Sequence, residues 1–200
     1  LLNTAPMVLV ARPGLEAQTF SDFVKLAKAR PGKYNYATSG VGTVLQLAME
    51  LLKERSGIFV THVPYRGGAQ IATDVIGDQV DLAMLVSTSA IPHVNGKRLK
   101  ALGVTSSKRL AALPNVPTFD EMPGLKGYDM VSWTGIFAPA RTPPAIVARL
   151  NQELNAVLAE EQVRAKLNEQ GALPGSGTPE QFGQFVQAEY ARNQKIVQSA

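Results

Sequence analysis

The 200-residue sequence has no cysteine, two histidines and one tryptophan. The absence of cysteine excludes disulfide bonds, thiolate metal sites and a cysteine nucleophile, and it is compatible with an oxidising compartment without establishing one. His62 and His93 would need carboxylate partners to form a zinc site or a catalytic triad, and no local motif supplies them. We therefore expect neither a metal nor a cofactor.

Long apolar runs and clusters of one charge are also missing. No apolar run reaches the length of a membrane span, and the opening residues do not form a signal peptide. Lysine and arginine are scattered, and the formal net charge is only +4. We therefore expect no nucleic-acid partner, whereas a weak positive field favours a small anionic ligand. The 45% share of hydrophobic residues indicates a globular protein with a substantial core.

The strongest local motif lies in residues 34–52. A β-branched and aromatic run passes through two glycines into apolar residues at helical spacing, which predicts a strand, a tight loop and a helix. Gly40 and Gly42 let backbone amides converge, and Ser39 and Thr43 add hydroxyl groups. Because the first amides of a helix are unpaired and carry partial positive charge, this loop suits an anion. The alternative is that Thr43 only caps the helix and the glycines only form the turn.

Residues 58–68 repeat this arrangement. A strand ends in a loop formed by Pro64, Tyr65, Arg66 and Gly67, and a second helix follows. In an open α/β sheet such loops gather at the carboxyl edge of the strands, where ligands bind. Tyr65 is a candidate for stacking on a ligand, and Arg66 for pairing with its carboxylate. The alternatives are a tyrosine that packs at the base of the loop and an arginine that is solvated.

Two further strands are predicted at 80–85 and 99–105. The first ends at Ser87, Thr88 and Ser89, whose hydroxyls are candidate ligand contacts, with capping of a turn as the alternative role. The second is almost continuously apolar, which is typical of a buried parallel strand. With the two earlier strands and helices, these segments predict an α/β fold.

The last long strand is predicted at 131–137 and contains Trp133. We expect it to pair with the opening strand, 7–10, as a double crossover between two lobes. That pairing would make Trp133 a residue of the cleft, with a core position as the alternative. The remaining sequence is helical apart from a short strand near Leu173. Its helices have no sheet of their own and need a partner surface that the sequence does not contain.

Taken in order, these motifs resemble the Bug family, the extracytoplasmic solute receptors of tripartite tricarboxylate transporters. The similarity covers essentially the whole chain. The residues that carry it are Pro31–Lys33, Asn35–Thr43, His62–Gly67, Pro92–Val94 with Gly96 and Lys97, Leu99–Ser106, Leu113–Thr118, and Phe137–Pro139 with Thr142–Pro144.

The resemblance implies a two-lobed α/β fold similar to type II periplasmic binding proteins, which closes on a small carboxylate and passes it to membrane permease subunits. It implies an N-terminally truncated chain with a hinge strand at 1–7 and a complete ligand-binding second lobe at 8–128. Residues 129–200 would then be the hinge return and the C-terminal helices of the first lobe. The expected location is the periplasm, with the signal peptide outside this chain. Exposed apolar helices on such a fragment are expected to promote self-association.

The resemblance also assigns roles to the loops. Residues 39–43 are expected to hold a ligand carboxylate through amide and hydroxyl groups, and residues 64–68 to line the cleft beside it. Many relatives have a polar pair at the strand end where this chain has Leu85 and Val86, so a less polar distal pocket is expected. The implied function is binding without chemistry.

Two other classes of function fit less well. One is the effector-binding domain of a transcription regulator, which uses a similar two-lobed fold at about this length. The other is an enzyme, which would need an acid/base pair. Asp74, Asp78 and Asp81 are the carboxylates nearest to one another, and their helix and turn contexts predict solvated side chains instead.

Overall fold

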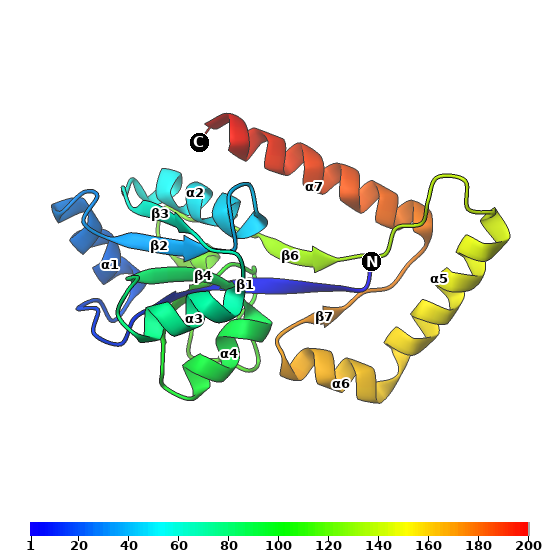
Figure 1. Cartoon of the computed structure of the whole chain (residues 1–200), viewed down its shortest axis with the longest axis horizontal. Helices are drawn as coiled ribbons and strands as arrows, with labels where there is room; N and C mark the ends of the chain where they lie inside the picture. The colour runs from blue at the N-terminus through cyan, green and yellow to red at the C-terminus, as the bar shows by residue number, and fades with distance from the viewer. Residues whose placement is uncertain (200) are drawn as a thin grey trace.

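The computed structural model describes residues 1–199, and most of its strands gather around one long strand, β1 (Figure 1). The strands are β1 (Asn3–Ala11), β2 (Asn35–Thr38), β3 (Thr61–Pro64), β4 (Leu82–Val86), β5 (Lys100–Val104), β6 (Val131–Thr134) and β7 (Leu173–Pro174). The helices are α1 (Phe20–Ala29), α2 (Val44–Ser56), α3 (Gly68–Ile76), α4 (Ser87–Asn95), α5 (Pro144–Ala159), α6 (Glu161–Glu169) and α7 (Pro179–Ser199), with a 3-10 turn, η1, at Phe119–Glu121.

The main sheet has the strand order β3-β2-β4-β1-β5. Strand β2 runs parallel to β3 and β4, whereas β1 is antiparallel to both of its neighbours, β4 and β5. The prediction that residues 99–105 form a parallel strand is therefore wrong, because β1 lies between β5 and the parallel strands. The strand is apolar because it is covered on both faces, with Leu102 in one core and Val104 in the other.

Helices cover the main sheet on both faces. Along β1, Met7 and Leu9 lie in a core with residues of α1 and α2, while Val8 and Val10 lie in a second core with residues of α3 and α4. This alternation is the two-residue period of a strand. The predicted α/β class is confirmed, as three layers of helices, sheet and helices.

Strand β1 is long enough to belong to two sheets. Its first half pairs antiparallel with β6 and, at its start, with β7, while its second half pairs with β4 and β5. The predicted pairing of the opening strand with the strand of Trp133 is confirmed. Strands β1 and β6 thus join the sheet lobe, which we define as residues 8–128, to the helical part, which we define as residues 129–199.

Helix α7 returns from the helical part and runs back over the sheet lobe towards α2 (Figure 1). Near its end, Ile196 is buried in the core that contains α1 and α2. Arg192 donates a hydrogen bond to the carbonyl oxygen of Asp129 at 3.1 Å. These contacts anchor α7 on both parts of the molecule.

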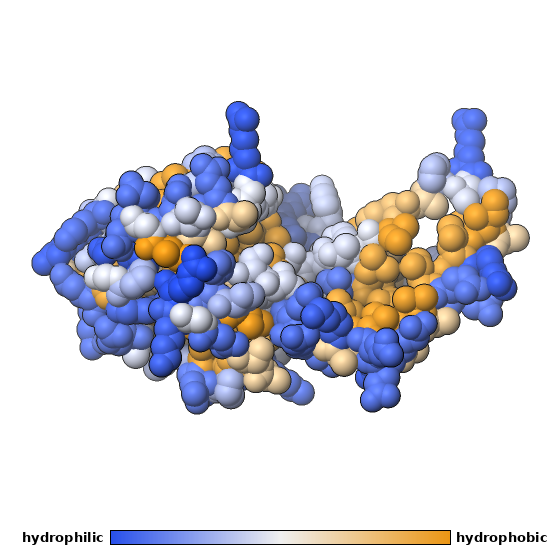
Figure 2. Space-filling view, turned by 60° about the horizontal axis from the view of Figure 1, so that its bottom comes forward, coloured by the Kyte–Doolittle hydropathy of each residue, from blue (hydrophilic) through white to orange (hydrophobic). Residues whose placement is uncertain are grey.

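An apolar surface extends over the helical part (Figure 2). Phe137 is 66% exposed, Leu150 50% and Val157 47%, and no residue of α5 is buried. The expectation that the helices after β6 lack a partner surface within the chain agrees with the exposure of α5 and α6, whereas it is wrong for α7, whose end packs into the core of the sheet lobe. Within residues 1–199, no helix is both long and apolar enough to cross a membrane.

Candidate functional site

The loop at residues 39–43, which we call the anion loop, follows β2 and ends at the cap of α2. Gly40 and Gly42 have φ of +133° and +76°, conformations that other residues rarely adopt. The hydroxyl of Thr43 donates to the carbonyl oxygen of Gly40 at 2.9 Å and accepts from the first turn of α2. The loop is therefore held in a fixed shape by its glycines and its cap.

Some amides of the anion loop are already paired and others are not. Gly42 N–H donates to the side-chain oxygen of Gln46 at 2.6 Å, so this glycine does not offer its amide as the sequence predicted. By contrast, the amides of Ser39, Val41 and Thr43 donate no hydrogen bond to any residue within 1–199. The loop therefore presents unpaired donors at the N-terminus of a helix, where a negative charge is stabilised.

The loop at residues 64–68 adjoins the anion loop. A Cβ built on Gly40 would lie 3.8 Å from the carbonyl oxygen of Tyr65, and Tyr65 N–H donates to the carbonyl oxygen of Thr38 at 2.9 Å. The structure therefore brings together the two junctions that the sequence singled out. Strands β2, β3 and β4 are parallel, so their loops share one edge of the sheet, and β2 points towards the helical part in Figure 1.

The side chains of this second loop have different environments. The Tyr65 hydroxyl donates to Asp74 at 2.7 Å, and partial burial together with this bond raises the pKa of Tyr65 to about 12. The hydroxyl proton of Tyr65 is therefore already donated to a carboxylate of the sheet lobe. Arg66 is exposed and forms no ion pair with any described residue, which leaves its guanidinium free for an anion. Pro64 and Gly67 shape the backbone, and Gly67 has an extended conformation with φ of −178°.

The hydroxyl residues after β4 separate into two groups. Ser87 is fully buried and donates to the carbonyl oxygen of Gly171 at 3.1 Å, so it joins the sheet lobe to the helical part rather than offering a free hydroxyl. Thr88 and Ser89 are exposed, and the Ser89 hydroxyl lies 3.9 Å from a Cβ built on Gly68. Ser89 is therefore the member of this group that adjoins the loop at residues 64–68.

Trp133 lies in an aromatic cluster of the helical part. Its ring packs edge-on against Phe182 and Phe185 of α7, each with centroids 5.7 Å away. Phe137 completes the cluster at 6.5 Å. Trp133 is half-buried and is not among the buried core residues, so its place in the cleft stays a prediction.

Two residues that support the anion loop were not identified from the sequence. Thr38 is fully buried at the end of β2, and its hydroxyl oxygen lies 2.6 Å from Nε2 of His62. The hydroxyl also reaches the carbonyl oxygen of Gly40 at 3.2 Å. A buried threonine opposite a histidine on the next strand carries no distinctive sequence pattern, because the register between the strands decides that they meet.

The three aspartates that the sequence singled out as a possible acid/base group all contact other side chains. Asp81 pairs with Arg12 at 2.9 Å and also accepts from the amide of Asn35 at 3.1 Å. Asp74 accepts from Tyr65, and Asp78 lies 3.4 Å from Arg12. The expectation of solvated side chains is therefore wrong for Asp74 and Asp81, whereas the Asp78 side chain is 58% exposed, as predicted. No group of three or more potential metal ligands occurs in the described part of the chain.

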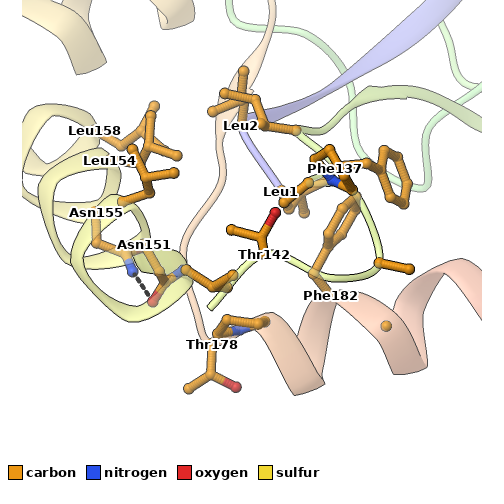
Figure 3. A pocket seen from close by; sticks show the side chains of 18 residues that line it. Leu1, Leu2, Phe137, Thr142, Asn151, Leu154, Asn155, Leu158, Thr178 and Phe182 are labelled. Atoms are coloured by element: carbon orange, nitrogen blue, oxygen red, sulfur yellow. Dashed lines mark hydrogen bonds between the residues drawn. The ribbon is translucent and has the colours of Figure 1, made fainter. Parts of the chain in front are cut away.

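A hollow of about 350 Å³ lies in the helical part, away from the glycine loops (Figure 3). Its wall is largely apolar, and Asn151 and Asn155 are bonded to each other and to the carbonyl oxygen of Gly177. The residues labelled around it are Leu1, Leu2, Phe137, Thr142, Asn151, Leu154, Asn155, Leu158, Thr178 and Phe182. This apolar hollow lacks the charged groups that would hold a carboxylate.

Comparisons with known proteins agree with this geometry. A family model described as a tripartite tricarboxylate transporter family receptor matches residues 1–200. The chain is 37% identical over 197 residues to a UPF0065 protein from the tcbD-tcbE intergenic region of Pseudomonas sp., covering 98% of this chain and 59% of that protein. It is 30% identical over 192 residues to protein BugT of Bordetella pertussis, covering 96% and 59% respectively. The chain thus spans less than two thirds of the length of these relatives.

Solved structures share the fold. Rpa4515 of R. palustris with adipate has a TM-score of 0.93 at 32% identity, covering 98% of this chain and 66% of that one. The periplasmic binding protein BugD gives 0.92 at 29% identity, with 100% and 67% coverage. MatC of Rhodopseudomonas palustris with bound malate gives 0.88 at 32%, with 98% and 68% coverage. The expected periplasmic-binding-protein fold is confirmed, and the family is one of receptors rather than enzymes. The chain belongs to the tripartite tricarboxylate transporter family of receptors, as its resemblance to the Bug proteins indicated.

Proposed function

We propose that this chain forms part of a receptor that captures a small organic carboxylate at the anion loop and delivers it to the permease of a tripartite tricarboxylate transporter. The observation that carries the proposal is the set of unpaired amides at Ser39, Val41 and Thr43, at the N-terminus of α2. A carboxylate accepts several such bonds and is favoured by the helix dipole. The receptor acts in the periplasm, as members of its family do.

The ligand that fits best is a dicarboxylate. One carboxylate would bind the anion loop, and Arg66, which is exposed and without an ion pair among the described residues, would reach the second. The adipate and malate of the two related structures support this class of ligand. Val86, half-buried at the end of β4, would place an apolar surface beside the ligand.

The two parts of the chain would have the roles of two lobes. Residues 1–7 and the return through β6 would act as the hinge, residues 8–128 as the lobe that binds the carboxylate, and residues 129–200 as part of the opposing lobe. Closure of such lobes removes the ligand from water, which strengthens the hydrogen bonds to its charged groups.

Calorimetric titration with malate and adipate tests the proposal. Ser39→Ala removes a hydroxyl that has no partner in residues 1–199, and the double variant with Thr43→Ala also removes the hydroxyl of the cap. We expect about tenfold weaker binding for Ser39→Ala and a larger loss for the double variant. Thr43→Ser, which keeps the cap, and Ser21→Ala, which alters an exposed side chain of α1, serve as controls. Unchanged affinity in the double variant would exclude the anion loop as the binding site.

We also propose that the apolar surface of the helical part mediates self-association of this 200-residue chain. Leu150 and Phe137 are exposed there, at 50% and 66%. Contiguous apolar surface of this kind is rare on monomers unless it binds something.

A further inference from the structure

Thr38 connects the anion loop to His62 on the neighbouring strand. Its Oγ1 lies 2.6 Å from Nε2 of His62, 3.2 Å from the carbonyl oxygen of Gly40 and 3.4 Å from the amide nitrogen of Gly40. The φ of Gly40, +133°, belongs to a region that is open essentially to glycine. The orientation of this peptide group therefore depends on the hydrogen bonds around it.

We take the neutral ring of His62 as the tautomer with its proton on Nδ1, so that protonation of the ring adds a proton at Nε2 and changes how Thr38 uses its single hydroxyl proton. When Nε2 carries no proton, it accepts the proton of Thr38, and the hydroxyl oxygen can accept from Gly40 N–H. When Nε2 is protonated, it donates to Thr38, and the hydroxyl proton turns to the carbonyl oxygen of Gly40. That carbonyl already accepts from Thr43 at 2.9 Å. In the second state two hydroxyls hold the carbonyl oxygen of Gly40, while the Thr38 oxygen keeps a lone pair for the amide of Gly40.

The charged groups that face His62 belong to α2. The imidazole stacks on Tyr36 with ring centroids 4.9 Å apart, and the Tyr36 hydroxyl donates to Glu50, which pairs with Lys53 at 2.6 Å. Burial lowers the pKa of His62, an effect that Glu50 opposes and Lys53 reinforces. The ring therefore gains its proton below the ordinary histidine range.

We propose that His62 is a positioning residue of the carboxylate site, acting through Thr38, so that protonation of its ring strengthens carboxylate binding. This inference rests on the proposed function of the anion loop. Protonation would contribute in two ways, by fixing the carbonyl of Gly40 between two hydroxyls, which holds the loop in one shape, and by placing a positive charge behind the loop.

The first test is the pH profile of malate binding by calorimetry. Between about pH 7.5 and about pH 4.5 we expect the affinity of the unaltered protein to rise on the order of fivefold relative to His62→Gln, which can donate to Thr38 but does not titrate, and the rise should fall in the lower half of this range because burial lowers the pKa of His62. Because the carboxylates of malate titrate equally with every variant, the comparison cancels their effect. His93→Gln changes the other histidine and should keep the unaltered profile. A profile for His62→Gln that matches the unaltered protein would overturn the proposal.

The second test needs no ligand. In a nuclear magnetic resonance titration of the free protein, the amide of Gly40 should shift with the same midpoint as the ring of His62. The shift should persist in Thr38→Ser and disappear in Thr38→Val. If the amide does not follow the histidine in the unaltered protein or in Thr38→Ser, the connection is refuted, whether or not Thr38→Val folds. The amide of Gly40 could follow the titration of His62 while malate and adipate fail to bind at any pH. In that case the proposed function fails, whereas the link from His62 through Thr38 to Gly40 stands.

Discussion

Thr105 is hydrogen-bonded to Met7 through both its backbone and its side chain. Thr105 N–H donates to the carbonyl oxygen of Met7 at 2.9 Å, and Met7 N–H donates to the Thr105 hydroxyl at 2.8 Å. The same hydroxyl donates to the carbonyl oxygen of Met130 at 2.6 Å. One buried side chain thus fixes β1 and the approach to β6 at the boundary between the sheet lobe and the helical part.

Replacing Thr105 by valine should destabilise the protein strongly. The change keeps the shape of the side chain but leaves Met7 N–H and the Met130 carbonyl without their partner. Each buried polar group left unpaired costs about 1–3 kcal/mol. Urea unfolding should therefore show a clear loss for Thr105→Val and a smaller one for Thr105→Ser, which keeps the hydroxyl. Equal stabilities of the two variants would argue against a structural role for the hydroxyl.

Alanine at Gly40 should strain the anion loop, whereas alanine at Gly67 should not. A Cβ on Gly40 would meet no atom closer than 3.8 Å, so the cost, roughly 1–3 kcal/mol, would come from its φ of +133°. Gly67 has extended backbone and nothing within 4 Å of an added Cβ. Thermal unfolding of the two variants measures the difference. A loss of stability for Gly67→Ala as large as that for Gly40→Ala would contradict this explanation.

The ion pair of Glu121 predicts a specific dependence of stability on pH. Hydrogen bonds from Arg109 and from the amide of Thr118 lower the pKa of Glu121 to about 2. A depressed carboxyl pKa adds stability above the pKa of the unfolded chain, and this contribution disappears as the pH falls towards the folded value. The free energy of unfolding should therefore fall less steeply between about pH 4.5 and about pH 2 in Glu121→Gln.

The matched control for Glu121 is Glu16→Gln, which alters an exposed carboxylate with no ion pair to another described residue. This variant should leave the decrease in the free energy of unfolding at acid pH the same as in the unaltered protein. Identical slopes for Glu121→Gln and the unaltered protein would mean that the pair with Arg109 does not persist in solution.

Polar substitutions on the helical part should reduce self-association. Leu150→Gln and Phe137→Ser remove apolar side chains from the exposed surface, and sedimentation velocity at several protein concentrations should show a shift towards monomer. Phe59→Ser removes an equally exposed aromatic residue, 61% exposed, from the sheet lobe. The proposal requires that this control retain the association of the unaltered chain. Sedimentation as a monomer at every concentration by the unaltered protein would refute it.

The elements that depend on local sequence could be predicted. The pairing between strands far apart in the chain could be predicted only in part. The junction at residues 39–43 was identified because glycines and a capping threonine between a strand and a helix have local conformational consequences. The pairing of β5 was predicted wrongly, because an apolar sequence indicates that both faces of a strand are covered and does not indicate that its neighbour, here β1, is antiparallel. The pairing of β1 with β6 was predicted as a double crossover between two lobes, and the antiparallel ladder between residues 3–6 and 131–134 confirms it.

The sequence by itself determined the α/β class, the two glycine loops and the family, since these follow from residue spacing and ordered motifs along the chain. Only the tertiary structure decided which hydrogen-bond donors near the two loops remain unpaired. It assigns Gly42 N–H to Gln46, Ser87 to Gly171 and Tyr65 to Asp74. It also places His62 behind the anion loop through the register of β2 and β3. A hydrogen bond depends on distance and direction between groups far apart in the chain, and only the packed fold fixes those.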